Sequence, residues 1–443
     1  MKKETMIAAI RQVLDSNMQN KHMHAFSESA RLNEDLYLDS VLVLQLILHL
    51  ELDLGLSVPE QNITAADYAT VSSLADFLCQ IGSARPKVAV PQEEEFEDVK
   101  VHCFVSCVCE SLKRKGIDHR PFYFGVWDAT FSISENFKLH YHSDDVDHGD
   151  FRDWFEKLYG VALEPWYDKG LAKEDNILVL QGLLDTKSSD QHLMVMLDMY
   201  QLPERENKFN QNPFPHYVML ENTDDPTKLM MFDPDFRWEG ELDAGRIYNA
   251  ISQPTVAGGY LINENWLRHA NDNDVQAYFE TCFIAEDNPL TSAIRQIFNA
   301  HLRGVDDLSL SALHLALREI RVIAVRKYAY EHGFAFFWRA LGLMDDDFEY
   351  WCDVIEDLIQ TYTKIQYQVM KLAETKDLDL QVGIYALLNK QDQTEYRIKK
   401  RLFEVYRDWC ELNDLSDRRH LLPSAALLRT VRATFTAYGS SLR

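Results

Sequence analysis

The chain has 443 residues, of which 46% are hydrophobic and 26% are charged, a composition typical of folded globular proteins. This length accommodates two or three domains and excludes a single small module. The net charge of −25 disfavours the phosphate contacts that dominate nucleic-acid binding. It favours a cationic or neutral partner, with polyamines as candidate ligands, although acidity also serves solubility.

Two features bear on the compartment of the protein. No apolar run approaches the about 18 residues that span a bilayer, and residues 1–5 lack the layout of a secretory signal. The seven cysteines are odd in number and dispersed, which disfavours a disulfide framework. We therefore expect a cytoplasmic protein without a membrane partner.

The patterns along the chain predict a multidomain protein. An all-α domain is expected at residues 1–82, and a linker with two prolines and an acidic run at 83–100. An α+β domain with an antiparallel sheet follows at 101–262, with strands at 176–181, 193–200, 216–220 and 229–232. The region 263–443 is mostly helical, with helices at 308–330, 346–374, 378–389 and 394–412.

A serine stands at the start of an apolar helix near the N-terminus. Residues 36–41 read Leu-Tyr-Leu-Asp-Ser-Val, and the helix predicted from residue 41 ends before Gly55. A helix start suits a phosphodiester, because its free N–H groups and dipole favour an anion. The alternative is that Asp39 and Ser40 merely cap an ordinary helix.

The whole layout of residues 1–82 resembles the carrier-protein family, whose pattern is Leu-Gly-x-Asp-Ser-Leu followed by a helix. The matching positions are Asp39, Ser40, Glu51, Gly55, Val58 and Pro59, whereas Tyr37 and Val41 replace the usual Gly and Leu. The resemblance implies a four-helix acyl or aryl carrier domain with 4'-phosphopantetheine on Ser40. It also implies a phosphopantetheinyl transferase as partner.

A cysteine stands at the start of a second helix, predicted from Cys103 to residue 115 and closed by a basic turn and Gly116. A thiol in this position is favoured as the thiolate nucleophile. Cys107 and Cys109 are expected to be packing residues, and zinc binding by these cysteines is disfavoured.

A histidine and an aspartate are expected to meet in a hairpin. Two strands at about 216–220 and 229–233 are joined by a polar turn. If Leu220 pairs with Leu229, His216 lies opposite Asp233 with their Cβ atoms roughly 5 Å apart. The carboxylate could then orient the imidazole.

This order of cysteine, strand-opening histidine and Asp-Pro resembles the papain-like superfamily, especially its C39-type peptidase and butirosin-type acyltransferase branches. Further matches to the latter are His102, Gly125, Asp198, Tyr200, Leu202 and Pro203. The resemblance implies Cys103 as nucleophile, His216 as base and Asp233 as its orienter, with the Cys103 N–H as an oxyanion donor. No side-chain oxyanion donor is assigned, and a structural role for these three residues is the alternative.

Together the two resemblances imply transfer of a carrier-bound acyl group to an amine, forming an amide. The combination resembles the petrobactin siderophore pathway, in which a dihydroxybenzoyl group passes from an aryl carrier to spermidine-type amines. Adenylation signatures are absent from the sequence, so a separate loading enzyme is expected. The alternatives are a thioesterase and a non-catalytic platform for carrier docking.

Two remaining segments have less specific interpretations. Residues 140–148 contain His and Asp side chains of metal-ligand type, but we expect a solvated acidic loop and no metal site. The aromatic residues at 334–338 require burial, which core packing, cover over the cleft or a homodimer interface would provide.

Overall fold

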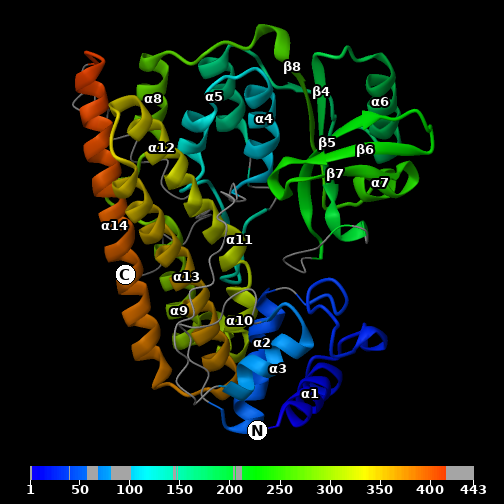
Figure 1. Cartoon of the computed structure of the whole chain (residues 1–443), viewed down its shortest axis with the longest axis vertical. Helices are drawn as coiled ribbons and strands as arrows, with labels where there is room; N and C mark the ends of the chain where they lie inside the picture. Colours follow the sequence, from blue (N-terminus) through cyan, green and yellow to red (C-terminus); the bar gives the residue numbers. More distant parts are fainter. Residues whose placement is uncertain are drawn as a thin grey trace, which may run out of the picture. The chain divides into compact units, whose positions relative to one another are not determined.

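The computed structural model describes residues 2–38, 40–56, 68–80, 101–142, 146, 148–202, 205 and 212–415, with Ser40 and Val41 described by backbone only. The chain divides into two compact units. The N-terminal unit is Met1–Asp98 with Met199–Phe214, and the large unit is Val99–Asp198 with Pro215–Arg443. Figure 1 shows the elements of both units.

Helices form the described part of the N-terminal unit. Its α helices are α1 (Lys3–Gln12), α2 (Ser40–Leu54) and α3 (Val71–Gln80), and α1 continues as a π turn over Val13–Asn17. They enclose a hydrophobic core of their own, to which Ile10, Leu46 and Leu74 contribute. Residues 57–67, where a fourth helix of the expected carrier bundle would fall, lie outside the described residues.

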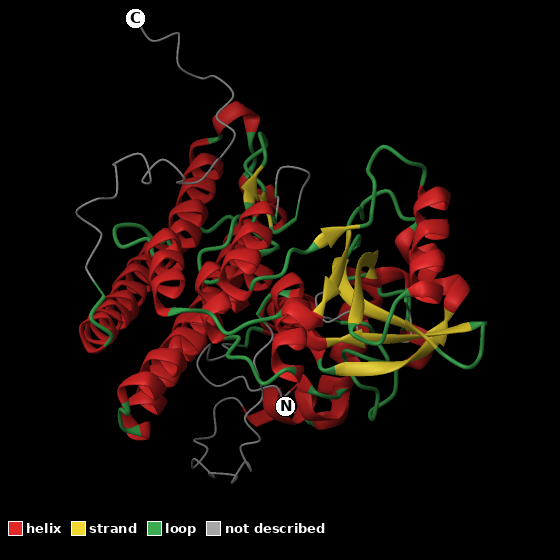
Figure 2. Cartoon of the chain, turned by 90° about the horizontal axis from the view of Figure 1, so that it is seen from above, coloured by secondary structure: helices red, strands yellow, loops and turns green. Residues whose placement is uncertain are grey.

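The described residues of the large unit contain a six-stranded antiparallel sheet (Figures 1 and 2). Its spatial order is β3 (Glu164–Pro165), β8 (Gly259–Asn263), β4 (Gln191–Asp198), β5 (Pro215–Asn222), β6 (Lys228–Asp233) and β7 (Trp238–Asp243). A small hairpin of β1 (Ser132–Ile133) and β2 (Leu139–His140) lies outside this sheet.

Helices pack on both faces of the six-stranded sheet. On one face α4 (Cys103–Arg114) contacts β5, and on the other α6 (Lys173–Thr186) contacts β5 while α7 (Ala244–Ile251) contacts β4 (Figure 1). α5 (Gly149–Tyr159) lies beyond α4, beside the helical part of the unit. The expected α+β class with an antiparallel sheet therefore holds for this part of the chain.

The helical part of the large unit follows the sheet in sequence. Its α helices are α8 (Asp272–Cys282), α9 (Pro289–Arg303), α10 (Leu313–Ala316), α11 (Ile320–Ala324), α12 (Ala329–Leu341), α13 (Asp345–Thr375) and α14 (Leu380–Leu412). A short 3-10 turn, η10 (Val325–Tyr328), connects α11 to α12. Among the described residues no helix combines the length and apolarity needed to cross a membrane.

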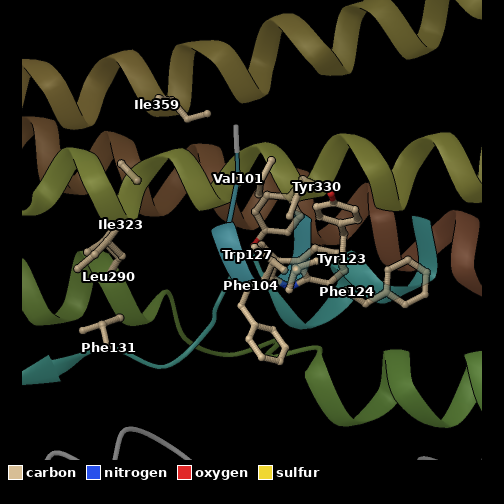
Figure 3. Packing of buried hydrophobic residues seen from close by; sticks show 14 of the residues in the cluster. Val101, Phe104, Tyr123, Phe124, Trp127, Phe131, Leu290, Ile323, Tyr330 and Ile359 are labelled. Carbon is tan, nitrogen blue, oxygen red and sulfur yellow. The ribbon is translucent and has the colours of Figure 1, made fainter. Parts of the chain in front are cut away.

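One hydrophobic core joins the α/β and helical parts, from Val101 to Cys410. The indole of Trp127 stacks on the ring of Tyr330 of α12, with centroids 4.9 Å apart. Figure 3 shows both residues among the buried side chains of this core. The boundary expected at 262–263 therefore lies within a continuous core. Phe334, Phe337 and Trp338 are buried in it, so core packing accounts for these aromatic residues.

A buried ion network crosses the same junction. Lys327 of η10 lies 2.6 Å from Asp128 and 2.6 Å from Glu395 of α14. Lys399, one turn after Glu395, lies 3.0 Å from Asp128. Two cations and two carboxylates thus neutralise each other in the interior and join the α/β part to the helical part.

One predicted strand is wrong, because residues 176–181 belong to helix α6. Its buried side chains Asn176, Leu180 and Leu184 recur every four residues, which is a helical spacing. Leu178, inside the same apolar run, is 64% exposed. The continuous run of apolar letters concealed the helical period.

Two helix predictions also need correction. Residues 308–330 are not one helix, because the chain breaks near Leu317, where Gln366 of α13 donates to the carbonyl oxygens of Leu317 and Arg318. The helices predicted at 378–389 and 394–412 are one continuous helix, α14, which begins at Leu380. Between the two predicted segments, the side chain of Gln391 is buried and donates to the Leu358 carbonyl at 2.9 Å. The polar residue is therefore accommodated inside the helix and does not end it.

Candidate active site

Cys103 is the first residue of α4, as predicted. The preceding residue, His102, is extended and gives the helix no side-chain cap. Asp235 instead holds the segment that leads into α4: its Oδ1 accepts from the backbone N–H of Val101 and of His102 at 3.2 Å each, and from the Ser106 hydroxyl at 2.8 Å. The start of α4 is thereby tied to the turn that follows β6.

His216 and Asp233 form a buried pair. His216 is the second residue of β5 and Asp233 the last of β6, with side chains 3% and 0% exposed. The His216 Nε2 lies 2.9 Å from the Asp233 Oδ1. The same oxygen accepts from the Phe236 backbone N–H at 3.2 Å, which fixes the carboxylate at the end of its strand.

The electrostatics of His216 place Cys103 beside this pair. Burial alone would lower the pKa of His216, but the charge of Asp233, the charge of Cys103 and hydrogen bonds with both side chains raise it well above its ordinary value. Because Nε2 is engaged by Asp233, Nδ1 is the ring nitrogen that remains for the thiol. The structure thus brings Cys103, His216 and Asp233 together.

The predicted strand register was wrong by two residues. Leu220 pairs with Met231, and Asn222 pairs with Leu229, so His216 is not directly opposite Asp233. Instead His216 pairs with Leu197 of β4. Side chains alternate with a period of two, so a shift of two residues keeps His216 and Asp233 on one face as diagonal neighbours.

The other two cysteines of α4 serve packing, as expected. The Cys107 thiol is buried and donates to the Tyr217 carbonyl at 3.4 Å, and burial raises its pKa well above the usual range. Burial also raises the pKa of Cys109. All seven cysteines of the chain, each of them in the described part, are free thiols.

His102 is buried next to the candidate nucleophile. Its ring makes edge contacts with His148 and Phe151, and its Nδ1 has no hydrogen-bond partner among the described residues. Burial, the cation of Arg326 and His148 lower its pKa well below the ordinary value. His102 is therefore a neutral imidazole near neutral pH.

The helical part contains Arg326, a buried arginine that no sequence pattern singles out. Arg326 lies on η10, and its Nη1 donates to the carbonyl oxygens of Ala129 and Thr130 at 3.4 and 3.1 Å. Its Nη2 donates to the Tyr141 carbonyl at 3.3 Å. The Tyr141 backbone N–H in turn donates to Glu319 at 2.7 Å. A cation from the C-terminal region is thus held by segments of the α/β part.

The other positions that match the acyltransferase pattern lie in different parts of the structure. A side chain at Gly125 would collide with Tyr278 and Phe151, so its glycine serves close packing. Asp198 is buried at the end of β4. Tyr200 and Leu202 belong to the N-terminal unit, and Pro203 lies outside the described residues. Within the described part no group of His, Cys, Asp or Glu side chains has a metal-binding arrangement.

At the candidate carrier site, Ser40 is the first residue of α2, which ends at Leu54. Gly55 follows in a left-handed conformation, and the Leu56 N–H bonds back to the Glu51 carbonyl at 3.1 Å. Tyr37, where carrier proteins usually have Gly, has φ +53°, a conformation that favours glycine. Asp39, Val58 and Pro59 lie outside the described residues.

Comparison with known proteins matches both parts of this chain. Residues 98–267 match the DUF6005 N-terminal domain and residues 273–421 the DUF6005 C-terminal domain. Petrobactin synthase of Bacillus anthracis is 38% identical over 315 residues, covering 71% of this chain and 96% of the relative. The acyl carrier protein AsbD of the same organism is 40% identical over 78 residues, covering 18% of this chain and 86% of the relative. The chain therefore belongs to the DUF6005 family, as a homologue of petrobactin synthase that also contains a segment homologous to an acyl carrier protein.

Proposed function

We propose that this chain is an enzyme of siderophore biosynthesis that transfers an acyl or aryl group from a carrier-bound thioester, through Cys103, to an amine. The buried His216–Asp233 pair beside Cys103 carries this proposal. Homology to petrobactin synthase supports an enzyme of siderophore biosynthesis. Homology to an acyl carrier protein supports a carrier role for the N-terminal unit.

In this proposal Ser40 bears 4'-phosphopantetheine, whose thiol holds the acyl group as a thioester. The residues present fit that group, because Ser40 opens α2 and the first N–H groups of a helix have no intrahelical acceptor. A phosphopantetheinyl transferase would attach the arm, and a separate adenylating enzyme would load it.

The first chemical step is acylation of Cys103. His216 accepts the thiol proton, and the sulfur forms a bond with the thioester carbonyl carbon while the carbonyl π electrons move to oxygen. When the oxyanion collapses, the bond to the arm's sulfur breaks and His216 returns a proton to that leaving thiol. Asp233 holds the imidazole in place and stabilises its charged form.

The second step transfers the acyl group to an amine. The nitrogen forms a bond with the acyl carbon, the bond to the Cys103 sulfur breaks, and His216 takes the proton that the nitrogen loses. Amide formation requires exclusion of water from Cys103 at this stage, because water would give the free acid. A dihydroxybenzoyl group and a polyamine are the proposed substrates, and the net charge of −25 favours a cationic acceptor.

Intact mass of the purified chain tests the carrier role. After incubation with a phosphopantetheinyl transferase and coenzyme A, the wild type is expected to gain the mass of the arm, and Ser40→Ala is expected to gain nothing. Ser29→Ala, at an exposed serine of the same unit, is the matched control and should be modified fully. Modification of Ser40→Ala would show that another residue bears the arm.

The pH dependence of acylation tests the role of Asp233. Because Asp233 raises the pKa of His216, the protonated imidazole persists at higher pH in the wild type. Asp233→Asn removes that charge, so the alkaline limb of the rate profile is expected to move to lower pH. The rate should also fall about 10²- to 10⁴-fold as the imidazole loses its orientation.

Asp225→Asn, at an exposed residue of the turn between β5 and β6, is the control for Asp233→Asn and should leave the profile unchanged. The measurement is the rate of acyl transfer from soluble dihydroxybenzoyl-S-pantetheine between about pH 6 and 10. An unchanged alkaline limb in Asp233→Asn would contradict the assigned role.

A further inference from the structure

We propose that Tyr141 is a positioning residue, which holds the start of β5 and thereby sets His216 for proton exchange with Cys103. Glu319 and Arg326 of the helical part hold Tyr141 in turn. This inference rests on the proposed function and adds to it a contribution from the C-terminal region. It follows from the hydrogen bonds of Tyr141, the residue just after β2.

The first four residues of β5 have a neighbouring strand on only one edge among the described residues. β5 pairs with β4 from its first residue, whereas its pairing with β6 begins at Met219. In an antiparallel ladder the backbone groups of successive residues point to opposite edges. Phe214 bonds toward the β4 side, because its carbonyl accepts from the Met199 N–H at 2.9 Å. The carbonyls of Pro215 and Tyr217 therefore point to the edge that β6 leaves uncovered.

Side chains take the place of a strand at this edge. The Tyr141 hydroxyl donates to the Pro215 carbonyl at 3.4 Å. The Cys107 thiol of α4 donates to the Tyr217 carbonyl, also at 3.4 Å. Both acceptor residues are buried, where a carbonyl without a donor is costly, so these bonds fix the strand. His216 lies between the two carbonyls, and the position of its backbone depends on both bonds.

The helical part fixes Tyr141 through its backbone. The Tyr141 N–H donates to Glu319 Oε2 at 2.7 Å, and its carbonyl accepts from Arg326 Nη2 at 3.3 Å. The other carboxylate oxygen of Glu319 lies 3.8 Å from His140 Nδ1. Glu319 immediately precedes α11 and Arg326 lies on η10, so one short stretch of chain holds both backbone groups of Tyr141. Its ring packs against the hydrophobic core, which gives the hydroxyl a defined position.

His216 has to meet two partners at once in the proposed mechanism. Its Nε2 lies 2.9 Å from Asp233, which is fixed at the end of β6, and it exchanges a proton with Cys103 at the start of α4. Because these partners belong to other elements, a small shift of β5 disturbs both contacts together. Tyr141 thus acts on the reaction through His216 and not by contact with the acyl group.

Tyr141→Phe tests the proposal in the full-length chain, because it removes only the hydroxyl. One measurement is acyl transfer from dihydroxybenzoyl-S-pantetheine, for which kcat is expected to fall about 10- to 10²-fold while KM changes by less than about threefold. The other is alkylation of Cys103 by iodoacetamide at about pH 7, followed by the mass of its peptide. Its rate is expected to fall at least about threefold, because a displaced imidazole accepts the thiol proton less readily.

The control for this variant is Tyr396→Phe. The Tyr396 hydroxyl likewise donates to a backbone carbonyl, that of Glu286, at 3.0 Å, and its removal should leave both rates unchanged. Glu319→Ala removes the acceptor of the Tyr141 N–H and is expected to lower kcat as Tyr141→Phe does. Glu319→Gln keeps an acceptor oxygen there and should retain kcat to within about threefold.

The double variant Tyr141→Phe with Glu319→Ala shows whether the two residues act through one hydroxyl. Its kcat is expected to lie within about threefold of the weaker single variant, and losses that multiply would overturn the proposal. Wild-type rates in Tyr141→Phe would overturn it, as would a fall in both rates matched by an equal loss of folded protein. If wild-type Cys103 takes no acyl group at all, the proposed function is wrong, and the alkylation rates alone then decide whether Tyr141 positions His216.

Discussion

Replacing Cys103 by alanine is expected to lower amide formation by roughly 10³-fold or more, while Ser40 still receives the arm and the acyl group. The reason is that the sulfur is the only atom in the proposed mechanism that forms a bond with the acyl carbon between the thioester and the amide. His216 and Asp233 only move and hold protons, so they cannot replace the sulfur that carries the acyl group once the thiol is absent. The loaded carrier should therefore accumulate as the thioester.

Intact mass of the loaded chain, followed over time after addition of spermidine, measures this effect. Cys352→Ala, at a half-buried cysteine of α13, is the matched control and should transfer at the wild-type rate. Amide formation by Cys103→Ala at the control rate would mean that the amine attacks the carrier thioester directly. The large unit would then serve as a platform that brings the two substrates together.

Replacing Lys327 by methionine is expected to lower the free energy of unfolding by about 3–5 kcal/mol. Lys327 is 1% exposed, and its removal leaves the carboxylates of Asp128 and Glu395 buried with a single remaining cation, Lys399. Methionine fills much of the same volume, so the loss comes from the charges and not from a cavity.

Urea unfolding of the full-length chain measures the change in stability. Lys390→Met is the control, because its ion pair with Asp357 is solvent-exposed at 2.8 Å and such pairs contribute about 0–1 kcal/mol. If Lys327→Met unfolds at the same urea concentration as Lys390→Met, the buried network does not stabilise the junction between the α/β and helical parts.

Local patterns were sufficient to predict the elements that carry the candidate residues. The start of a helix at Cys103 and the strands that contain His216 and Asp233 are encoded in a few neighbouring residues. The hairpin register needed more than local pattern, because β5 and β6 extend closer to each other than predicted: the turn is residues 223–227, whereas pairing Leu220 with Leu229 implies a longer loop over 221–228. The error was an even number of residues, so the face shared by His216 and Asp233 was still correct.

Two residues of the candidate site had no signal that sequence reasoning could use. No sequence pattern singles out Asp235, although its carboxylate accepts from the backbone N–H groups that lead into α4. Arg326 joins segments that are distant in the sequence, through its hydrogen bonds to Ala129, Thr130 and Tyr141. Its segment was predicted as regular helix, and only the break near Leu317 and the packing of η10 explain its position.

The central claim is that the acyl group passes through Cys103. The most direct test loads the chain on Ser40 with the dihydroxybenzoyl group, omits the amine, and digests the protein under acidic conditions for mass analysis of the peptide that contains Cys103. The account predicts a dihydroxybenzoyl thioester on Cys103 that disappears within one turnover when spermidine is added. An acyl group that stays on the Ser40 arm and reaches spermidine without ever appearing on Cys103 would contradict it.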